Sequence, residues 1–221
     1  MPIVAYIVTV LAGYLVGSIP TGFLVAKARG IDIRTVGSGN IGATNVFRQI
    51  GTVAGVFVLL MDALKGWVAF VLLAKLAAVW LYPGASAQAQ EALRICAGLS
   101  VIVGHNYTCW LHFKGGKGVA TTAGVLLAWV PWSLLIIFCV WVVVFALTRY
   151  VSLASICAAA SLPFAAWFTG EGLATVIITA AMGALAIYKH KANIKRLISG
   201  TETRLATKKA SPQPEAPKQT P

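Results

Sequence analysis

Long apolar runs alternate with short polar stretches along almost the whole chain. A helix that crosses a bilayer needs about 20 predominantly apolar residues in sequence. The pattern predicts seven helices, over residues 3–26, 52–81, 92–104, 119–130, 132–148, 151–168 and 173–188. The third and fourth are shorter than a full span, and the fourth ends at Pro131. We therefore expect an all-α integral membrane protein with seven transmembrane helices, some of them short.

The composition agrees with a membrane protein. Of all residues, 58% are hydrophobic and 11% are charged, and the mean hydropathy is +0.81, whereas soluble domains are about 25% charged. The net charge of +12 fits basic residues at the cytoplasmic ends of helices. We expect no nucleic-acid partner, because no nucleic-acid motif accompanies the charge. The four cysteines lack the spacing of metal ligands or of a disulfide framework, and we expect no metal site.

The distribution of Lys and Arg predicts the orientation of these helices. Cytoplasmic loops carry the excess of basic residues, which places the stretches 27–51, 105–118, 149–150 and 189–221 inside. The N-terminus is then outside and the C-terminus cytoplasmic. Fusing residues 117–148 into one helix would split the basic loops between the two sides, so we favour seven spans over six.

The chain divides into two parts by composition. Residues 1–198 contain all the apolar runs and are expected to form a single transmembrane catalytic domain, whose first run we interpret as a retained span and not a signal peptide. Residues 199–221 are rich in Pro, Thr, Lys and Ala without an apolar period. We expect them to form a disordered cytoplasmic tail.

A loop rich in glycine and lysine separates the two short helices. It reads Gly104-His105-Asn106-Tyr107-Thr108-Cys109-Trp110-Leu111-His112-Phe113-Lys114-Gly115-Gly116-Lys117-Gly118. It is not a nucleotide-binding P-loop, because Gly118 stands where a Ser or Thr would bind magnesium. Gly118 is expected to open a helix, and a helix N-terminus favours phosphate. His105 could act as an acid or base, or as a structural donor.

An earlier basic loop has the same character. Its sequence from Gly37 to Arg48 contains a literal GxGxxG at Gly37, Gly39 and Gly42. A dinucleotide site would need a preceding strand within a βαβ unit, and here a membrane helix precedes the motif. Its small, amide and basic side chains could instead surround an oxyanion with donors. A tight cytoplasmic turn with no ligand remains an alternative for this loop taken alone.

A third stretch and an intramembrane pair complete the polar features. In the run from Lys189 to Arg196, His190 and Asn193 share one helix face, although basic residues after a last span are often only anchors. Asp62 and Lys65, three residues apart in an apolar run, should form a supporting ion pair, because charges inside a membrane are costly. Three donor-rich stretches on one side indicate recognition of phosphate at the inner membrane face.

These residues resemble a known family, the bacterial acyl-phosphate:glycerol-3-phosphate acyltransferases of the PlsY type. The resemblance rests on Gly17-Ser18-Ile19-Pro20, Gly37 to Asn45 with Arg48, Asp62 to Gly66, Gly104-His105-Asn106, Phe113 to Ala120, and Lys189 to Ile194. It covers residues 17 to about 198 and leaves out the tail. It implies a seven-helix enzyme of the bacterial inner membrane with its active site on the cytoplasmic side.

The resemblance also implies the reaction and its partners. A fatty acyl group would pass from acyl phosphate to the 1-hydroxyl of glycerol 3-phosphate, giving lysophosphatidic acid and inorganic phosphate. This is the first acylation of phospholipid biosynthesis, and the family uses neither acyl-CoA nor acyl carrier protein as the direct donor. The enzyme would need no cofactor. Its partners would be the two substrates, the lipid bilayer and, as a candidate, the soluble enzyme that makes acyl phosphate.

The same resemblance assigns the site residues. The catalytic set is Ser38, Arg48, Lys117, His190 and Asn193. The substrate-binding set is Gly39, Asn40, Thr44, Asn45, His105, Lys114, Gly115, Gly116, Gly118 and Arg196. Arg48 and Lys117 would bind phosphate charge, and Ser38, Thr44 and Asn193 would supply hydrogen bonds. An acyl phosphate is already activated, so positioning and charge stabilisation are the main needs. We expect a substrate phosphate to accept the hydroxyl proton.

Two other functions fit parts of the pattern. A transporter for an organic phosphate would need a path through the membrane, and such proteins often show internal repeats, which we do not find here. A lipid-head-group phosphotransferase would use acidic metal ligands, and this chain has only Asp32 and Asp62 before residue 91. An assay for phosphate release and lysophosphatidic acid separates these functions from acyl transfer.

Overall fold

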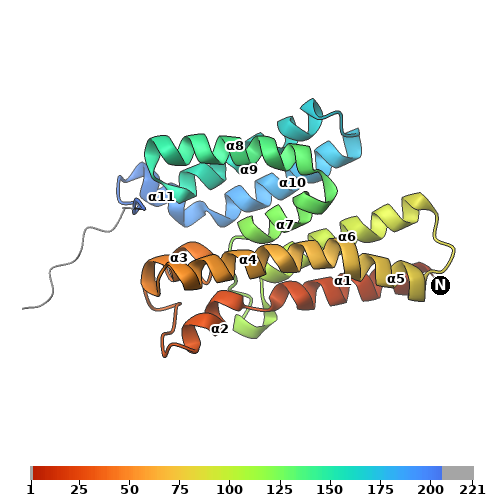
Figure 1. The fold of residues 1–221 in the computed structure, drawn as a ribbon, viewed down its shortest axis with the longest axis horizontal. Coiled ribbons are helices and arrows are strands. Elements are labelled where there is room, and N and C mark those ends of the chain that lie inside the picture. The colour runs from red at the N-terminus through yellow and green to blue at the C-terminus, as the bar shows by residue number, and fades with distance from the viewer. Residues whose placement is uncertain (1, 206–221) are drawn as a thin grey trace, which may run out of the picture.

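A computed structural model of the chain describes residues 2–205, whose regular secondary structure is helical, with no strand among them (Figure 1). The helices are α1 (Pro2–Ser18), α2 (Thr21–Lys27), α3 (Ala43–Gln49), α4 (Thr52–Val68), a π-helical turn η1 (Ala69–Leu73), α5 (Ala74–Leu81), α6 (Ala87–Asn106), a 3₁₀ turn η2 (Cys109–Leu111), α7 (Val119–Trp129), α8 (Pro131–Thr148), α9 (Val151–Phe168), α10 (Leu173–Lys189) and α11 (Lys191–Ile198). The all-α prediction is confirmed for this part of the chain.

Each predicted apolar run is helical, but fewer than seven helices have the length and composition of a span. The stretches that do are residues 2–27, 52–81, 131–148 and 151–168, and α10 with α11, bent by 59°, makes a fifth. The helix α7 has 11 residues, which rise only about 16 Å, against about 30 Å for a hydrocarbon core. The helix α7 is therefore too short to cross a hydrocarbon core by itself.

The prediction for α6 was too short. We expected residues 92–104, whereas the helix has 20 residues and begins at Ala87, after the capping hydroxyl of Ser86, which accepts a hydrogen bond from the Ala89 N–H. Its first turns carry Gln, Glu and Arg, and polar residues such as these sustain a helix as well as apolar ones. An apolar run marks only the part of a helix that faces lipid or protein.

The first predicted span is interrupted at residues 19–20. Pro20 has no N–H to donate, so the helical ladder of α1 stops at Ser18 and α2 starts again at Thr21. The carbonyl groups at the break are then free for other donors. The Ser18 carbonyl accepts the Thr108 hydroxyl, and the Ile19 carbonyl accepts the Lys65 ammonium at 3.1 Å. The break thus becomes an anchoring point for two other segments.

Glycines allow α1 and α6 to approach closely. A Cβ on Gly13 or Gly17 would collide with Ser100 or with the Val101 carbonyl of α6, and a Cβ on Gly104 would collide with the Tyr14 carbonyl of α1. The small residues at Gly13 and Gly17 therefore serve helix packing, as the GxxxG spacing suggests. The C-terminus of α6, which carries His105, is fixed against α1 in this way.

Two groups of helices lie side by side, with α7 between them (Figure 1). One contains α1 to α6 and the other α8 to α11. A shared hydrophobic core joins them and includes Phe70, Leu126, Ile137, Leu162 and Met182. The outward faces are apolar too: Phe138 and Leu147 on α8 are 56% and 80% exposed. A surface of this kind is stable against lipid and not against water.

Charge is concentrated at one end of the bundle. The helices α2, α3 and α11 and the α8–α9 turn gather at that end, at the left of Figure 1, while the N-terminus and the α5–α6 and α9–α10 connections lie at the other. Basic residues at the first end include Lys27, Arg29, Arg34, Arg48, Arg149, Lys195 and Arg196. Residues 199–205, which we assigned to the tail, pack against this end, and the remaining predicted tail lies outside the described residues.

Candidate active site

The loop before α3 is organised by the side chain of Asn45. Its amide Nδ2 donates to the carbonyl groups of Ile33, Val36 and Asn40 at 3.2, 3.1 and 2.9 Å, and its Oδ1 accepts the Ser38 N–H at 3.1 Å. Every hydrogen-bonding group of the buried amide is thus occupied by the loop itself. The predicted binding residue Asn45 therefore sets the shape of the loop that exposes Ser38.

The rest of that loop turns on glycine conformations. Gly37 and Gly39 have φ angles of 58° and 68°, which glycine adopts without strain. The Asn40 side chain accepts the Gly42 N–H at 2.8 Å, where α3 begins. Thr44 and Arg48 follow on α3 and are partly exposed. The geometry thus places Ser38, Thr44 and Arg48 on one short loop-and-helix unit.

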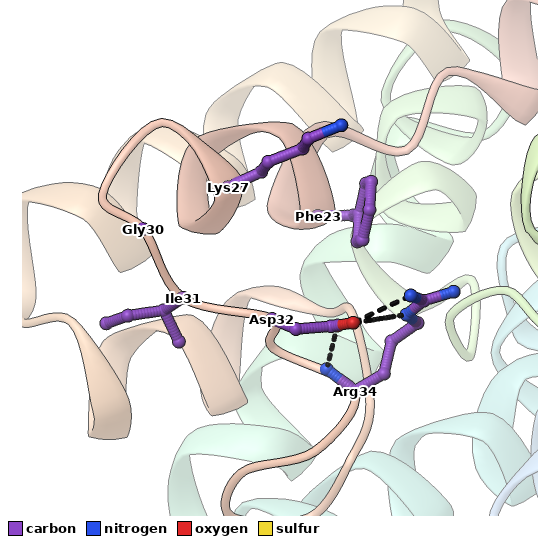
Figure 2. A pocket seen from close by; sticks show the side chains of 6 residues that line it. All are labelled: Phe23, Lys27, Gly30, Ile31, Asp32 and Arg34. Carbon is purple, nitrogen blue, oxygen red and sulfur yellow. Dashed lines mark hydrogen bonds and ion pairs between the residues drawn. The ribbon is translucent and has the colours of Figure 1, made fainter.

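A depression of about 330 Å³ lies between α2 and the segment that follows it (Figure 2). It is lined by Phe23, Lys27, Arg34 and the backbone turn from Gly30 to Asp32. Hydrogen bonds from Arg34 hold the pKa of the Asp32 carboxyl down to about 2. Arg34 and Asp32 satisfy each other at 2.7 Å in an exposed position, so this pair offers a substrate little unpaired charge.

The glycine loop between α6 and α7 serves a different purpose from the one expected. The N–H groups of Gly115 and Gly116 donate to the carbonyl groups of Asn106 and His105, at 3.3 and 3.0 Å. They cap the C-terminus of α6 and are not free for a phosphate. Gly118, with a φ of 78°, starts α7 against the Asn106 side chain. The glycines therefore fix the position of Lys117.

Lys117 belongs to a group of charged and amide side chains that we call the outer cluster. Its members are Arg48, Lys117, Asn193, Arg196 and Glu202. The Lys117 ammonium donates to the Asn193 Oδ1, and the Asn193 Nδ2 donates to the Glu202 carboxylate at 2.8 Å. The Arg196 Nε also donates to Glu202, at 2.7 Å, and Arg48 reaches the Thr203 carbonyl at 2.9 Å. Segments far apart in sequence thus meet at one place.

The charges of the outer cluster act on one another. Burial, followed by the like charges of Arg196 and Arg48, lowers the pKa of the Lys117 ammonium to about 8, although Glu202 opposes the shift. Burial acts to raise the pKa of Glu202, but hydrogen bonds from Ser152, Asn193 and Arg196 outweigh it and hold that pKa below its usual range. Three cations and one carboxylate leave a net charge of about +2.

Sequence reasoning missed Glu202. It lies in the segment that we assigned to a disordered tail, yet its residue is only 9% exposed and its carboxylate accepts three hydrogen bonds. Low hydrophobicity around it gave no sign of burial. The only available signal was an acid directly after a basic helix, between Arg196 and Arg204.

His190 lies at the bend between α10 and α11, near Lys117. Its Nδ1 is 2.7 Å from the Ala186 carbonyl oxygen, and the residue is 2% exposed. Because a carbonyl oxygen only accepts, Nδ1 carries the proton, and in the neutral ring Nε2 is an acceptor. His190 is thus equipped to accept a hydrogen bond from a hydroxyl group.

A second polar group, the inner cluster, consists of Asp62, Lys65 and His105. Lys65 Nζ lies 2.8 Å from Asp62 Oδ1 and 2.9 Å from His105 Nδ1. The Thr21 hydroxyl also donates to Asp62, at 3.2 Å. The expected ion pair of Asp62 and Lys65 is confirmed. Their side chains are only 3% and 7% exposed, so this ion pair is sealed from solvent.

The structure does not place all the predicted site residues together. Arg48, Lys117, Asn193 and Arg196 meet in the outer cluster, with His190 beside it. The loop residues Ser38, Gly39, Asn40, Thr44 and Asn45 adjoin Arg48, while Gly115, Gly116 and Gly118 support Lys117. Lys114 is exposed, and His105 belongs to the inner cluster. Within residues 2–205, no group of three or more His, Cys, Asp or Glu side chains is arranged to hold a metal ion.

A helical bundle with an apolar outer surface is typical of an integral membrane protein, and the positive charge of the outer cluster can attract anions. The family model for glycerol-3-phosphate acyltransferases matches residues 7–200, and the chain therefore belongs to the PlsY-type glycerol-3-phosphate acyltransferase family of membrane enzymes.

Similar proteins cover almost the whole chain. The glycerol-3-phosphate acyltransferases of Endomicrobium trichonymphae and Geotalea daltonii are each 46% identical to it, over 90% and 89% of this chain and 95% of theirs. The crystal structure of PlsY, an integral membrane glycerol 3-phosphate acyltransferase, in its glycerol 3-phosphate form is 40% identical. It superimposes with a TM-score of 0.79, over 91% of this chain and 96% of that one.

Proposed function

We propose that this protein transfers a fatty acyl group from acyl phosphate to the sn-1 hydroxyl of glycerol 3-phosphate. The products are lysophosphatidic acid and inorganic phosphate, in the first acylation of phospholipid biosynthesis. Structures of the related PlsY are described as glycerol 3-phosphate and lysophosphatidic acid forms, which supports this acceptor and this product. The identity of the acyl donor is the part of the proposal that most needs a direct test.

The observation that carries the proposal is the convergence of Arg48, Lys117 and Arg196 around a single carboxylate. Both substrates carry phosphate, and two phosphates repel each other. A site that holds them together needs more positive than negative charge. The net charge of about +2 in the outer cluster meets that need.

The residues then have distinct tasks in the reaction. The sn-1 oxygen attacks the acyl carbonyl carbon, the bond from that carbon to the phosphate oxygen breaks, and inorganic phosphate leaves. Arg48 and Lys117 hold phosphate charge, and Asn193 orients the Lys117 ammonium. Ser38 and Thr44 supply hydrogen bonds from the adjoining loop. Because the leaving group is already a good one, holding the reactants in line contributes most to the rate.

We propose that a substrate phosphate accepts the hydroxyl proton. The alternative acceptor is Nε2 of His190, which the neutral ring leaves without a proton. The test is the variant His190→Ala, which should bind glycerol 3-phosphate and retain measurable turnover. If His190→Ala abolished turnover with intact binding, and if added imidazole restored it, the proton would go to His190 instead.

We also propose that seven segments cross the bacterial inner membrane, with the N-terminus outside and the active site on the cytoplasmic side. The gathering of basic residues at the α2, α3 and α11 end supports this orientation. The short helix α7 would then hold Lys117 below the membrane surface, where acyl phosphate can enter from the lipid. Cysteines placed at Gly84 and at Lys195 in a cysteine-free background test it. A membrane-impermeant reagent should label residue 84 from outside and residue 195 only in opened vesicles.

One assay decides the donor. Purified protein is incubated with labelled glycerol 3-phosphate and, in separate reactions, with acyl phosphate, acyl-CoA or acyl carrier protein loaded with an acyl group. We expect equal amounts of lysophosphatidic acid and phosphate from acyl phosphate alone. Product from acyl-CoA or acyl carrier protein in place of acyl phosphate would overturn the proposed donor.

A further inference from the structure

The inner cluster determines where His105 carries its proton. The Lys65 ammonium has three neighbours within hydrogen-bonding distance: Asp62 Oδ1 at 2.8 Å, His105 Nδ1 at 2.9 Å and the Ile19 carbonyl at 3.1 Å. An ammonium has three N–H donors and no acceptor. The number of donors therefore equals the number of acceptors, and each contact uses one N–H.

It follows that His105 Nδ1 accepts from Lys65. An atom that accepts has its lone pair free, so the proton of the ring is on Nε2 and the imidazole is neutral. Asp62 lies 3.6 Å from Nδ1 and would favour a charged ring if it were alone. Lys65 already balances the Asp62 charge, and a proton on Nδ1 would face the ammonium directly.

The Nε2 edge of the ring lies against the glycine loop. A Cβ added to Gly116 would fall 2.1 Å from His105 Nε2, so only glycine can lie this close to the edge of the ring. The Gly116 N–H also donates to the His105 carbonyl at 3.0 Å. The next residue is Lys117, whose ammonium is in the outer cluster. The Nε2–H therefore lies beside Gly116, which directly precedes Lys117 in the glycine loop.

The break at Pro20 supplies the third acceptor. Because α1 ends at Ser18, the Ile19 carbonyl is outside the α1 ladder and is available to Lys65. The geometry around Lys65 thus depends on α1, α4 and α6 together. All members of the inner cluster are at least nine-tenths buried, so water does not compete for these bonds.

From this geometry we infer that Asp62 and Lys65 are positioning residues. They hold His105 as a neutral imidazole whose Nε2–H is a fixed hydrogen-bond donor, at the glycine loop, for an anionic oxygen of the substrate. The identity of that substrate rests on the proposed function, whereas the protonation state of His105 does not. A neutral donor adds a hydrogen bond to a site that already has its cations, without increasing their mutual repulsion.

Nitrogen NMR of the full chain with labelled histidine tests the protonation state directly. The three histidines are assigned with the variants His105→Gln, His112→Gln and His190→Gln. We expect His105 to show a protonated Nε2 and an unprotonated Nδ1 at neutral pH. In Lys65→Met the preference for this one form should be lost. A charged ring, or a proton on Nδ1 in the natural protein, would overturn the inference.

Two amide substitutions of His105 separate its two nitrogens. The variant His105→Asn has a side-chain oxygen near the position of Nδ1 and can still accept from Lys65, but it has no donor at the Nε2 position. The longer side chain of His105→Gln carries an N–H that reaches the Nε2 position. We expect His105→Asn to fold and to lose at least tenfold in kcat, while His105→Gln retains more activity than His105→Asn. The reverse order contradicts the inference.

A double variant distinguishes positioning from stability. Asp62→Leu with Lys65→Met removes both buried charges, which often leaves stability unchanged or improved. We expect the thermal midpoint of the double variant to lie closer to that of the natural protein than the midpoint of a variant that lacks only one of the two charges. Its kcat should be at least tenfold below that of the natural protein, because His105 is no longer fixed. If kcat recovered together with the midpoint, the cluster would be merely structural and the inference would be wrong.

Failure of this inference can be distinguished from failure of the proposed function. If acyl phosphate were not the donor, the natural protein would give no product from it, and the NMR result would be unaffected. Glu171→Gln, in the α9–α10 turn at the opposite end of the bundle, is the control for the loss of an acid far from both clusters. It should keep the kcat and the midpoint of the natural protein.

Discussion

The inner and outer clusters contain the same kinds of groups and use them differently. Each holds a carboxylate, at least one cation and a neighbouring histidine. In the inner cluster, Asp62 and Lys65 balance each other, and the Lys65 N–H groups all have acceptors. In the outer cluster, Glu202 faces three cations and Arg196 is 35% exposed. The balanced, sealed pair of Asp62 and Lys65 holds His105 in place, whereas the unbalanced, open outer cluster can receive the charge of a substrate.

The two histidines differ in the same sense. His105 Nδ1 accepts from Lys65, so its Nε2 donates, whereas His190 Nδ1 donates to the Ala186 carbonyl, so its Nε2 accepts. Both rings are buried, and in their neutral forms they offer opposite groups to the space around Lys117. The neighbour of Nδ1 decides which group Nε2 presents: it is the Lys65 ammonium for His105 and the Ala186 carbonyl for His190.

The largest effect should come from removing half of the balanced cluster. Asp62→Ala leaves the Lys65 ammonium buried without its counter-charge, which should cost about 3–5 kcal/mol of stability. Thermal unfolding in detergent, followed by helical circular dichroism, measures it. The control is Asp32→Ala, whose exposed pair with Arg34 is screened by water and salt. An equal fall of the midpoint in both variants would remove the distinction between sealed and open pairs.

Removing a cation from the unbalanced cluster should affect activity and not folding. Lys117→Ala should lower kcat/KM by roughly 10²–10³-fold, as the loss of one preorganised donor at a developing charge does. Steady-state assays with acyl phosphate and glycerol 3-phosphate measure the change. Lys195→Ala removes an exposed lysine from α11 and should leave the rate unchanged. Near-normal activity of Lys117→Ala would exclude the glycine loop from the mechanism.

A smaller effect is expected from neutralising Glu202 within the outer cluster. Glu202→Gln can still accept from Ser152 and Asn193, but its amide meets the Arg196 Nε with a second donor. Losing this charge-assisted bond should cost about 1.5–3 kcal/mol, felt as a roughly tenfold or greater loss in kcat/KM. Parallel thermal unfolding shows whether the fold is retained. An increase in activity would mean instead that the carboxylate competes with the substrate for this place.

The smallest effect is a dependence on pH. Since burial brings the pKa of Lys117 to about 8, the ammonium is charged below that pH and loses its proton above it. The kcat/KM for glycerol 3-phosphate, which reports on the free enzyme, should fall to about half at pH 8 and continue downward. Lys117→Arg keeps its charge at higher pH and should remove this fall. A natural protein with constant kcat/KM beyond pH 9 would contradict the assignment.

Much of the fold could be predicted, because lipid and core demand long apolar helices. Two of the errors have local causes. The helix α6 extends back to Ala87 through polar residues that no hydrophobic pattern can include. The first run breaks at Pro20, although its apolar pattern continues to Ala26. The carbonyl groups at the break accept hydrogen bonds from Lys65 and Thr108, and these two residues are distant in sequence.

The candidate site was less accessible from the sequence. Residue types and the resemblance drew attention to Lys117, Asn193 and Arg196, which the structure places together. Their connection through Glu202 depends on how residues 201–205 fold back, and no periodicity reports that. The role of the glycines was also hidden, since a glycine that caps a helix and one that binds phosphate look alike in a sequence.

The spacing of Asp62 and Lys65 has a consequence for how the protein enters the membrane. Both belong to α4, three residues apart on one face, so they can pair as soon as that helix forms. His105 is made later, when α6 emerges. We therefore expect the two charges to enter the lipid as a neutral pair, before any later helix is made. Moving the lysine two positions further along α4 should break this pairing and hinder insertion of the helix.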